Sequence, residues 1–239
     1  ARRAAAVVLA CVPALAAAEL PGRGTSYRTG DPAIDALQPL LAQTLDANGK
    51  SYVGRTGPVT GFGAGTTYPQ IWIRDSATLL PLTRWHFGRG HLASWIEEHL
   101  AHQNPDGSLN DWVAAGEPAR FQADAPRARE VFRAGAVVLT ADRNTTETDQ
   151  ESSAVDAARV VLDATRDVAW LRKPIAGRRV LDRLDEALSF VAERRMSGGL
   201  VTAAFTADWG DVSPVHGDQR VIYLDEATRE PSAGFARTR

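Results

Sequence analysis

The chain has 239 residues, of which 44% are hydrophobic and 23% are charged, a balance typical of globular proteins and not of disordered chains. The formal net charge of -2 gives no basic excess that would attract phosphate backbones, so we expect no nucleic-acid partner. Cys11 is the single cysteine, which excludes an intramolecular disulfide and a cysteine-rich metal site, and we expect no metal.

Residues 1–18 have the features of a secretory signal peptide. Arg2 and Arg3 precede an apolar run that small residues close at Ala18, and the run is too short to span a bilayer as a stable helix. We therefore expect an exported protein, secreted or periplasmic, with no membrane contact after signal removal. A buried alanine-rich helix is the alternative. Residues 8–11 resemble a lipoprotein cleavage site, but the apolar run continues past Cys11, which argues against a lipid anchor.

Residues 19–239 are expected to form one mainly helical domain. Asp31 as N-cap and Pro32 at the first helical position predict a helix that ends at Gly49. Its apolar face consists of Ile34, Leu37, Leu40, Leu41 and Leu45. Glycines alternate with Val, Thr, Phe and Tyr over residues 52–73 and predict a short β-hairpin. These glycines lack the lysine that follows a phosphate-binding loop, so we expect no cofactor.

Further along the chain, helical spacing predicts a helical pair over residues 77–87 and 92–102. Residues 114–146 are interpreted as an inserted loop with one strand at 136–139. Thr148 and Glu151 have capping-box spacing and predict the start of the next helix. A second helix over residues 175–195 would complete an antiparallel helical hairpin.

Polar and aromatic residues gather in the links between these helices. The clusters are Trp72-Ile73-Arg74-Asp75-Ser76, Glu147-Thr148-Asp149-Gln150-Glu151 and Asp208-Trp209-Gly210-Asp211. Sugar sites need such a mixture, because aromatic faces stack on a pyranose while carboxylates and arginine bond its hydroxyls. Glycoside cleavage also needs a carboxylic acid of raised pKa that protonates the leaving oxygen. Asp208 and Asp211 flank a tryptophan, and desolvation or mutual repulsion would raise such a pKa.

The first and third clusters, in this order, resemble the motifs of the six-hairpin glycosidases. These (α/α)6-barrel glycoside hydrolases include glucosidase I, trehalase, glucoamylase, bacterial exo-mannosidases and disaccharide phosphorylases. The resemblance implies that Arg74 and Asp75 bind the sugar and that Asp211 is the general acid. Asp208 would be a supporting ligand or the alternative acid. Residues 104–112 also resemble an active-site loop of this clan, which implies substrate contacts for Asp111 and Trp112.

The resemblance covers residues 30–225 and departs from the clan in one respect. The sequence contains fewer helices than a closed six-hairpin barrel needs, and the late hairpin that carries the catalytic base has no match. Asp225 and Glu226 fit no base motif. The expected fold is therefore a mainly α, incomplete (α/α)6 toroid that corresponds to the N-terminal half of such an enzyme.

The expected function is an exported glycoside hydrolase, or a piece of one, that acts with inversion on a carbohydrate substrate without a cofactor. Trp72, Trp112 and Trp209 would shape the cleft, with Glu147 and Asp149 as further sugar contacts. A disaccharide phosphorylase and a non-catalytic helical glycan-binding module are the alternatives. Structural roles also remain open: Asp75 as a helix cap, Asp208 and Asp211 in a turn, and Glu147 and Asp149 in a solvated loop. The sugar, linkage, anomer and oligomeric state do not follow from the sequence.

Overall fold

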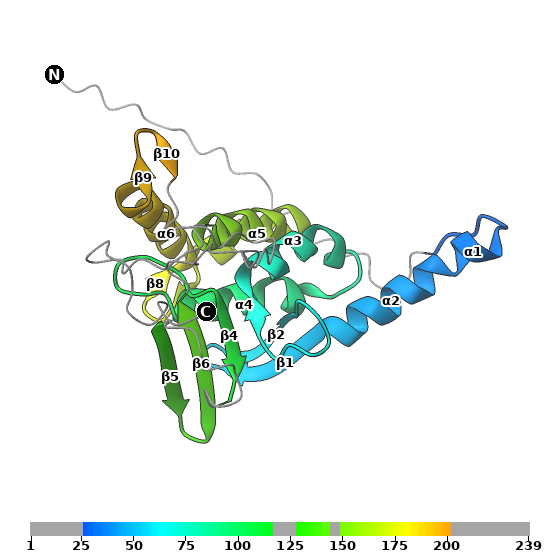
Figure 1. The fold of residues 1–239 in the computed structure, drawn as a ribbon, viewed down its shortest axis with the longest axis horizontal. Coiled ribbons are helices and arrows are strands. Elements are labelled where there is room, and N and C mark those ends of the chain that lie inside the picture. Colours follow the sequence, from blue (N-terminus) through cyan, green and yellow to red (C-terminus); the bar gives the residue numbers. More distant parts are fainter. Residues whose placement is uncertain (1–25, 117–127, 144–148, 202–239) are drawn as a thin grey trace, which may run out of the picture.

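Helices and antiparallel strands alternate along the chain and give a mixed α/β fold (Figure 1). The computed structural model describes residues 26–116, 128–143 and 149–201. The helices are α1 (Pro32–Asp35), α2 (Leu37–Asn48), α3 (Ile73–Thr83), α4 (Arg89–Ala101), α5 (Gln150–Thr165), the 3-10 helix η2 (Val168–Arg172) and α6 (Val180–Arg194). The strands are β1 (Gly49–Gly54), β2 (Gly57–Phe62), β3 (Ile71–Trp72), β4 (Trp112–Ala115), β5 (Ala128–Ala134), β6 (Val137–Arg143), β7 (Pro174–Ile175), β8 (Arg178–Arg179), β9 (Met196–Ser197) and β10 (Leu200–Val201). The signal peptide over residues 1–18 lies outside the described residues and stays a prediction.

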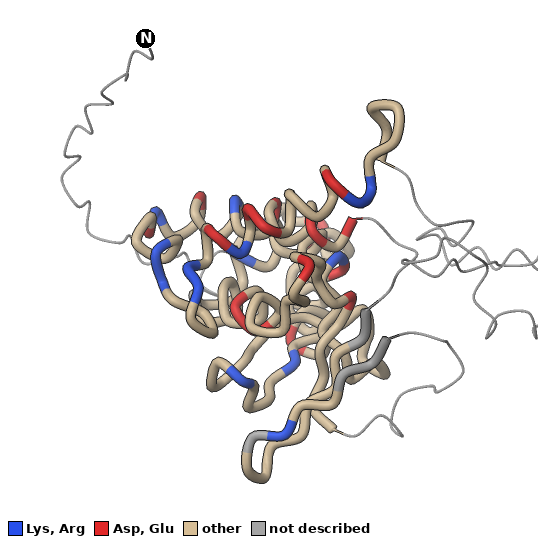
Figure 2. The backbone as a smooth tube through the Cα atoms, turned by 90° about the vertical axis from the view of Figure 1, so that its left-hand side faces the viewer, with Lys and Arg blue, Asp and Glu red and all other residues tan. Residues whose placement is uncertain are grey.

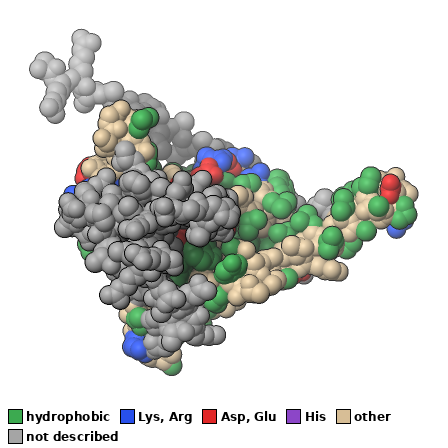
Figure 3. Space-filling view, viewed as in Figure 1, with side chains coloured by type: hydrophobic (Ala, Val, Ile, Leu, Met, Phe, Trp, Pro, Cys, Tyr) green, Lys and Arg blue, Asp and Glu red, His purple; other side chains and the backbone are tan. Residues whose placement is uncertain are grey.

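The expected first helix is present as α1 and α2, which extend from the body as an arm (Figure 1). Asp31 caps α1, because its carboxylate accepts from the backbone N–H of Ala33 at 2.8 Å, and Pro32 is the first helical residue, as predicted. The apolar face is real, but only Leu45 is buried. Apolar side chains therefore lie exposed along the arm (Figure 3).

The glycine-rich segment forms the expected β-hairpin, shifted toward the N-terminus, with β1 and β2 paired from Gly49↔Phe62 to Gly54↔Gly57. Arg55 and Thr56 occupy its turn. The hairpin packs against α4, and a Cβ on Gly61 would lie 2.9 Å from the Cβ of Trp95. A glycine is needed there because the strand backbone approaches the helix so closely.

The core lies between β2 and the helices α3, α4, α5 and α6, with α4 at its centre. Leu92, Trp95, Ile96 and Leu100 of α4 are each at most 1% exposed. Burial of a large apolar side chain contributes about 2 kcal/mol. The expected helical pair is thus confirmed as α3 and α4, although α3 begins earlier than predicted.

The predicted mainly α toroid is wrong, because β3, β4, β6 and β5 form an antiparallel four-stranded sheet in that order. The error lies in residues 114–146, which were interpreted as a loop with one strand. Val131, Phe132, Val137, Val138 and Thr140 favour strands, and Gly135, with φ +62°, turns the chain between β5 and β6. The strand predicted at 136–139 lies mainly in β6, and β5 is joined to it by a two-residue turn.

The helices α5 and α6 pack against each other, as expected for the second helical pair. Thr148 lies outside the described residues, so the predicted capping box with Glu151 stays a prediction. The carboxylate Oε1 of Glu151 accepts from the backbone N–H of Leu109 at 2.9 Å. Asp149 is the N-cap residue and makes no side-chain capping bond. A loop that is distant in sequence therefore helps to hold the start of α5.

Lysine, arginine, aspartate and glutamate are distributed together over the helices in Figure 2. The pairs are often local, such as Arg159 with Asp156 and Asp163 on α5. Among the residues that the structure describes, no helix has the length and apolar character needed to cross a membrane.

Candidate functional site

Trp72 marks the point where the chain changes from strand to helix. It is the last residue of β3 and the N-cap of α3, with φ -85° and ψ 132°. Arg74 and Asp75 consequently lie in the first turn of α3, where both are partly buried. An aspartate is favourable there because the helix dipole presents positive partial charge at its N-terminus. The backbone N–H of Ile73 donates to the carbonyl of Asp111 at 2.8 Å, which fixes this boundary against the loop before β4.

Most of that loop, residues 102–111, is buried although it is polar, with Pro105 and Asp106 exposed at its tip. Asn110 is 0% and Asp111 2% exposed, and the Asn110 amide Nδ2 donates to the carbonyl of His102 at 2.7 Å. Gly107 turns the loop with φ +92°, and a Cβ there would lie 2.5 Å from the carbonyl oxygen of Glu186 in α6. Buried loops are held by such hydrogen bonds, because an unpaired polar group away from water is costly.

Two of the predicted aromatic residues meet across the sheet. Trp72 pairs with Trp112 in the β3–β4 register, so both side chains lie on the same face. Their ring centroids are 6.0 Å apart and the ring planes are tilted by 57°. Trp112 is 2% exposed, whereas Trp72 is partly exposed. Trp72 is therefore the member of the pair that a ligand could contact.

The second predicted cluster reaches the same place from α5. The Arg74 guanidinium Nη1 donates to the Asp149 carboxylate Oδ2 at 2.9 Å, and the two side chains are 16% and 41% exposed. The structure therefore joins residues that are 75 positions apart in the sequence. Both Arg74 and Asp149 were predicted as sugar contacts, and they form one polar pair beside Trp72.

In this region, the indole Nε1 of Trp72 and the carboxylate Oδ1 of Asp149 are shielded from solvent and have no hydrogen-bond partner among the described residues. Buried polar atoms are nearly always satisfied, so a donor and an acceptor left over near one place require an explanation. A bound molecule that contributes hydroxyl groups is one such explanation. We call Trp72, Arg74, Asp111, Trp112 and Asp149 the tryptophan–arginine cluster.

The remaining predicted site residues, Glu147, Asp208, Trp209 and Asp211, lie outside the described residues. Their position relative to the tryptophan–arginine cluster therefore stays a prediction. Asp75 is one residue from Arg74 in the first turn of α3, with no contact to Asp149 among the described hydrogen bonds.

The sequence interpretation missed a buried polar network on α4. Glu98, which is 0% exposed, accepts hydrogen bonds from His102 Nε2 at 2.8 Å, from the backbone N–H of Arg55 at 2.8 Å, and from the backbone N–H and hydroxyl of Thr56, each at 2.9 Å. Burial alone would raise the pKa of Glu98. The hydrogen bonds from His102, Arg55 and Thr56 outweigh burial and lower this pKa to about 2. The carboxylate therefore holds the β1–β2 turn against α4.

Two neighbours of Glu98 respond to the same environment. Burial lowers the pKa of His99 to about 4, although its Nδ1 lies 2.8 Å from the carbonyl oxygen of Trp95, a contact that opposes the shift. Burial also raises the pKa of Tyr52 well above its usual value, and the charge of Glu98 adds to that effect. His99 and His102 are not part of a solvated helix face, because they are 1% and 2% exposed.

The buried ionisable groups of α4 were hard to recognise in the sequence. In the sequence, the charged surface of an exposed helix is suggested by Glu97, Glu98, His99 and His102. The sign of a central helix is that large apolar residues also occur in this segment, at Leu92, Trp95, Ile96 and Leu100. Within the described ranges, no group of three or more histidine, cysteine, aspartate and glutamate side chains is arranged to hold a metal ion.

Comparisons with known proteins identify no relative of this chain. No protein-family model matches the chain, no curated protein matches its sequence, and no solved structure matches its fold.

Proposed function

We propose that the chain binds a carbohydrate at the tryptophan–arginine cluster and acts as a glycoside hydrolase. The observation that supports this proposal is the meeting of three separate segments, the start of α3, the loop before β4 and the start of α5. Each segment contributes a residue type that sugar recognition uses. An aromatic face, a guanidinium group and carboxylates converge on one place.

The chemistry of these groups suits a pyranose ring. Trp72 offers a partly exposed aromatic surface backed by the buried ring of Trp112. Arg74 and Asp149 hold each other in a fixed geometry, so a sugar with adjacent hydroxyl groups would meet a donor and an acceptor that are already oriented. Preorganisation of this kind reduces the entropy that is lost when the ligand binds.

The acid step is assigned to Asp211 as part of the same proposal. Its carboxylic acid gives a proton to the glycosidic oxygen while the bond from that oxygen to the anomeric carbon breaks. With inversion, a second carboxylate about 6.5–9.5 Å from the acid takes a proton from a water molecule, which attacks the anomeric carbon from the opposite face of the sugar. No residue of this chain is assigned to this base. Asp208 is the neighbour whose charge would keep the pKa of Asp211 raised.

The proposal is tested with the purified full chain against a panel of aryl glycosides and disaccharides, with product release as the readout. We expect Asp211→Asn to lower kcat by at least about 100-fold and to leave sugar binding within about twofold, because only the proton transfer is removed. Asp163→Asn is the matched control, since Asp163 lies on the exposed side of α5. Turnover that is unchanged in Asp211→Asn would reject the assignment of the acid.

Other outcomes distinguish the alternative functions. Saccharide binding without turnover would indicate a glycan-binding protein and would remove the hydrolase part of the proposal. Turnover that depends on added inorganic phosphate would indicate a phosphorylase. If no saccharide in the panel is bound or cleaved, the carbohydrate proposal fails as a whole.

A further inference from the structure

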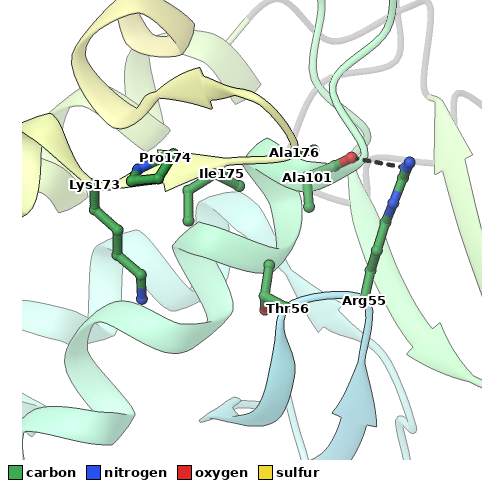
Figure 4. Close-up of a pocket in the computed structure, with 7 residues that line it drawn as sticks. All are labelled: Arg55, Thr56, Ala101, Lys173, Pro174, Ile175 and Ala176. Atoms are coloured by element: carbon green, nitrogen blue, oxygen red, sulfur yellow. Dashed lines mark hydrogen bonds between the residues drawn. The ribbon is translucent and has the colours of Figure 1, made fainter.

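A second recessed site lies at the C-terminal end of α4, between the β1–β2 turn and the β7–β8 hairpin (Figure 4). Its volume is about 280 Å³. The rim consists of Arg55, Thr56 and Lys173, and the apolar lining consists of Ala101, Pro174, Ile175 and Ala176. We call it the Arg55 pocket. None of its residues belongs to the tryptophan–arginine cluster.

Two cations stand on opposite sides of this pocket in Figure 4. The Lys173 ammonium Nζ is 2.7 Å from the Glu97 carboxylate Oε2, so its charge is offset by a neighbour. The Arg55 guanidinium differs, because its Nη1 donates to the carbonyl oxygen of Ala101 at 3.0 Å and no carboxylate pairs with it among the described side chains. The Arg55 charge is therefore the one that the pocket leaves without a counter-ion in this part of the chain.

The guanidinium is also held in place. Its Cζ lies 6.0 Å from the ring centroid of Phe132, and the backbone N–H of Arg55 donates to the buried Glu98. Thr56 adds no donor to the pocket, because its hydroxyl donates to Glu98. The remaining N–H groups of Arg55 are thus the polar recognition elements on this rim.

Arg183 is a further cation beside the pocket. Burial lowers the pKa of the neighbouring Arg183, and the charges of Arg178 and Arg55 lower it further, while Glu186 opposes them. The Arg183 guanidinium Nη2 donates to the carbonyl of Ala176, so this third cation contacts the pocket wall. An anion in the pocket would relieve part of this repulsion.

The wall itself contains an uncommon backbone conformation. Ala176 has φ +45° and is followed by Gly177 with φ +83° in the turn between β7 and β8. A left-handed conformation costs a residue with a Cβ about 1 kcal/mol. The turn keeps an alanine where glycine would be easier, and its methyl group contributes to the apolar lining together with Ile175 and Pro174.

We propose that the Arg55 pocket binds a small organic monoanion, a carboxylate with a short apolar body. The carboxylate would accept charge-assisted hydrogen bonds from Arg55, and the apolar body would pack on Ile175, Pro174 and Ala101. A single cation without a paired carboxylate among the described side chains matches one negative charge, and a volume of about 280 Å³ has room for a body of one ring. This inference does not depend on the carbohydrate proposal.

The test is a titration of the full chain with benzoate, followed by the amide NMR signals of residues 55–57, 101 and 176. We expect saturable shifts at these positions, at least tenfold weaker affinity in Arg55→Gln, and affinity within twofold of wild type in Arg159→Gln. Arg159 is the control because it is an exposed arginine of α5 that pairs with Asp156 and Asp163 and does not line the pocket. Thermal unfolding of both variants confirms that they remain folded.

Two further probes separate the parts of the proposal. Benzyl alcohol, which has the ring without the charge, should bind at least tenfold more weakly than benzoate, and so should inorganic phosphate, which has the charge without the ring. Benzoate affinity that is unchanged in folded Arg55→Gln, shifts that do not saturate, or equal binding of either probe would overturn the assignment.

Discussion

The α1–α2 arm and the region around α4, here called the junction, differ in which side chains they bury. The junction comprises α4, the β1–β2 turn and the loop of residues 102–111. The arm exposes Leu37 and Leu40 at 55% and 58%, whereas the junction buries Glu98 and His102 at 0% and 2%. The arm is held mainly by local hydrogen bonds, such as those of Asp31 and Asp35 in its first turns. The junction is held by bonds between residues that are distant in sequence, such as Leu109 with Glu151. Residue type alone therefore does not decide which side chains lie inside.

The largest effect is expected where charge is buried. Glu98→Gln removes the charge that accepts donors from His102, Arg55 and Thr56. We expect the free energy of unfolding to fall by about 3 kcal/mol in urea denaturation, because buried donors lose their partner. Glu193→Gln on the exposed side of α6 should change it by less than about 0.5 kcal/mol. Equal stability of the two variants would show that the Glu98 network does not hold the turn.

That network also shows what could be predicted from the sequence. Helical periodicity correctly predicted the helices around residues 31–49, 92–102 and 175–195, and the glycine alternation correctly predicted the β1–β2 hairpin. Within the sheet of β4, β5 and β6, only a strand at 136–139 was predicted, and it lies mainly in β6. The β5–β6 hairpin was missed although it is local, whereas the pairing of β4 with β6 depends on tertiary structure.

The residues of the candidate site could be predicted from the sequence, but the contacts between them could not. Trp72, Arg74, Asp111, Trp112 and Asp149 were selected by residue type, and the structure brings them together. The pairing of Arg74 with Asp149 and the bond from Leu109 to Glu151 could not be predicted, because they depend on how α3, α5 and the loop before β4 pack.

Acid should act on the junction before it acts on the arm. The folded-state pKa of His99 is about 4 against an ordinary 6.5, and that of Glu98 is about 2 against 4.5, so the folded chain binds fewer protons than the unfolded chain. The stability due to His99 is complete above pH 6.5 and is lost as the pH falls toward 4, and that due to Glu98 is lost between 4.5 and 2. We expect a decrease on the order of 3 kcal/mol between neutral pH and pH 4. Denaturant midpoints across this range measure it, and a flat profile would contradict the buried, neutral His99.

The ion pair of the tryptophan–arginine cluster should have an intermediate effect. A double-mutant cycle of Arg74→Ala and Asp149→Ala should give a coupling energy of about 1 kcal/mol, because Arg74 is largely buried. The exposed pair Arg159 and Asp163 is the matched comparison and should give about 0.3 kcal/mol. Equal coupling in the two cycles would indicate that the cluster pair is no more than a surface contact.

The smallest effect is expected on the arm. Leu40→Ser should change the free energy of unfolding by less than about 0.5 kcal/mol, because the leucine is 58% exposed in the folded chain. Leu92→Ala in the centre of α4 should cost about 3 kcal/mol by comparison. A large loss in Leu40→Ser would mean that the apolar face of α2 is covered in solution.

The most direct measurement of the carbohydrate site is a calorimetric titration of the full chain with a panel of monosaccharides and disaccharides that includes glucose, mannose, maltose and trehalose. The account predicts that at least one of them binds, that Trp72→Ala weakens its affinity at least about tenfold, since loss of a stacking surface costs on the order of 1.5 kcal/mol, and that Trp85→Ala leaves it unchanged. Trp85 is the control because it is 54% exposed beyond the end of α3, where it contacts Arg84. Equal affinity in the Trp72→Ala and Trp85→Ala variants, or no binding by the wild-type chain, would contradict the account.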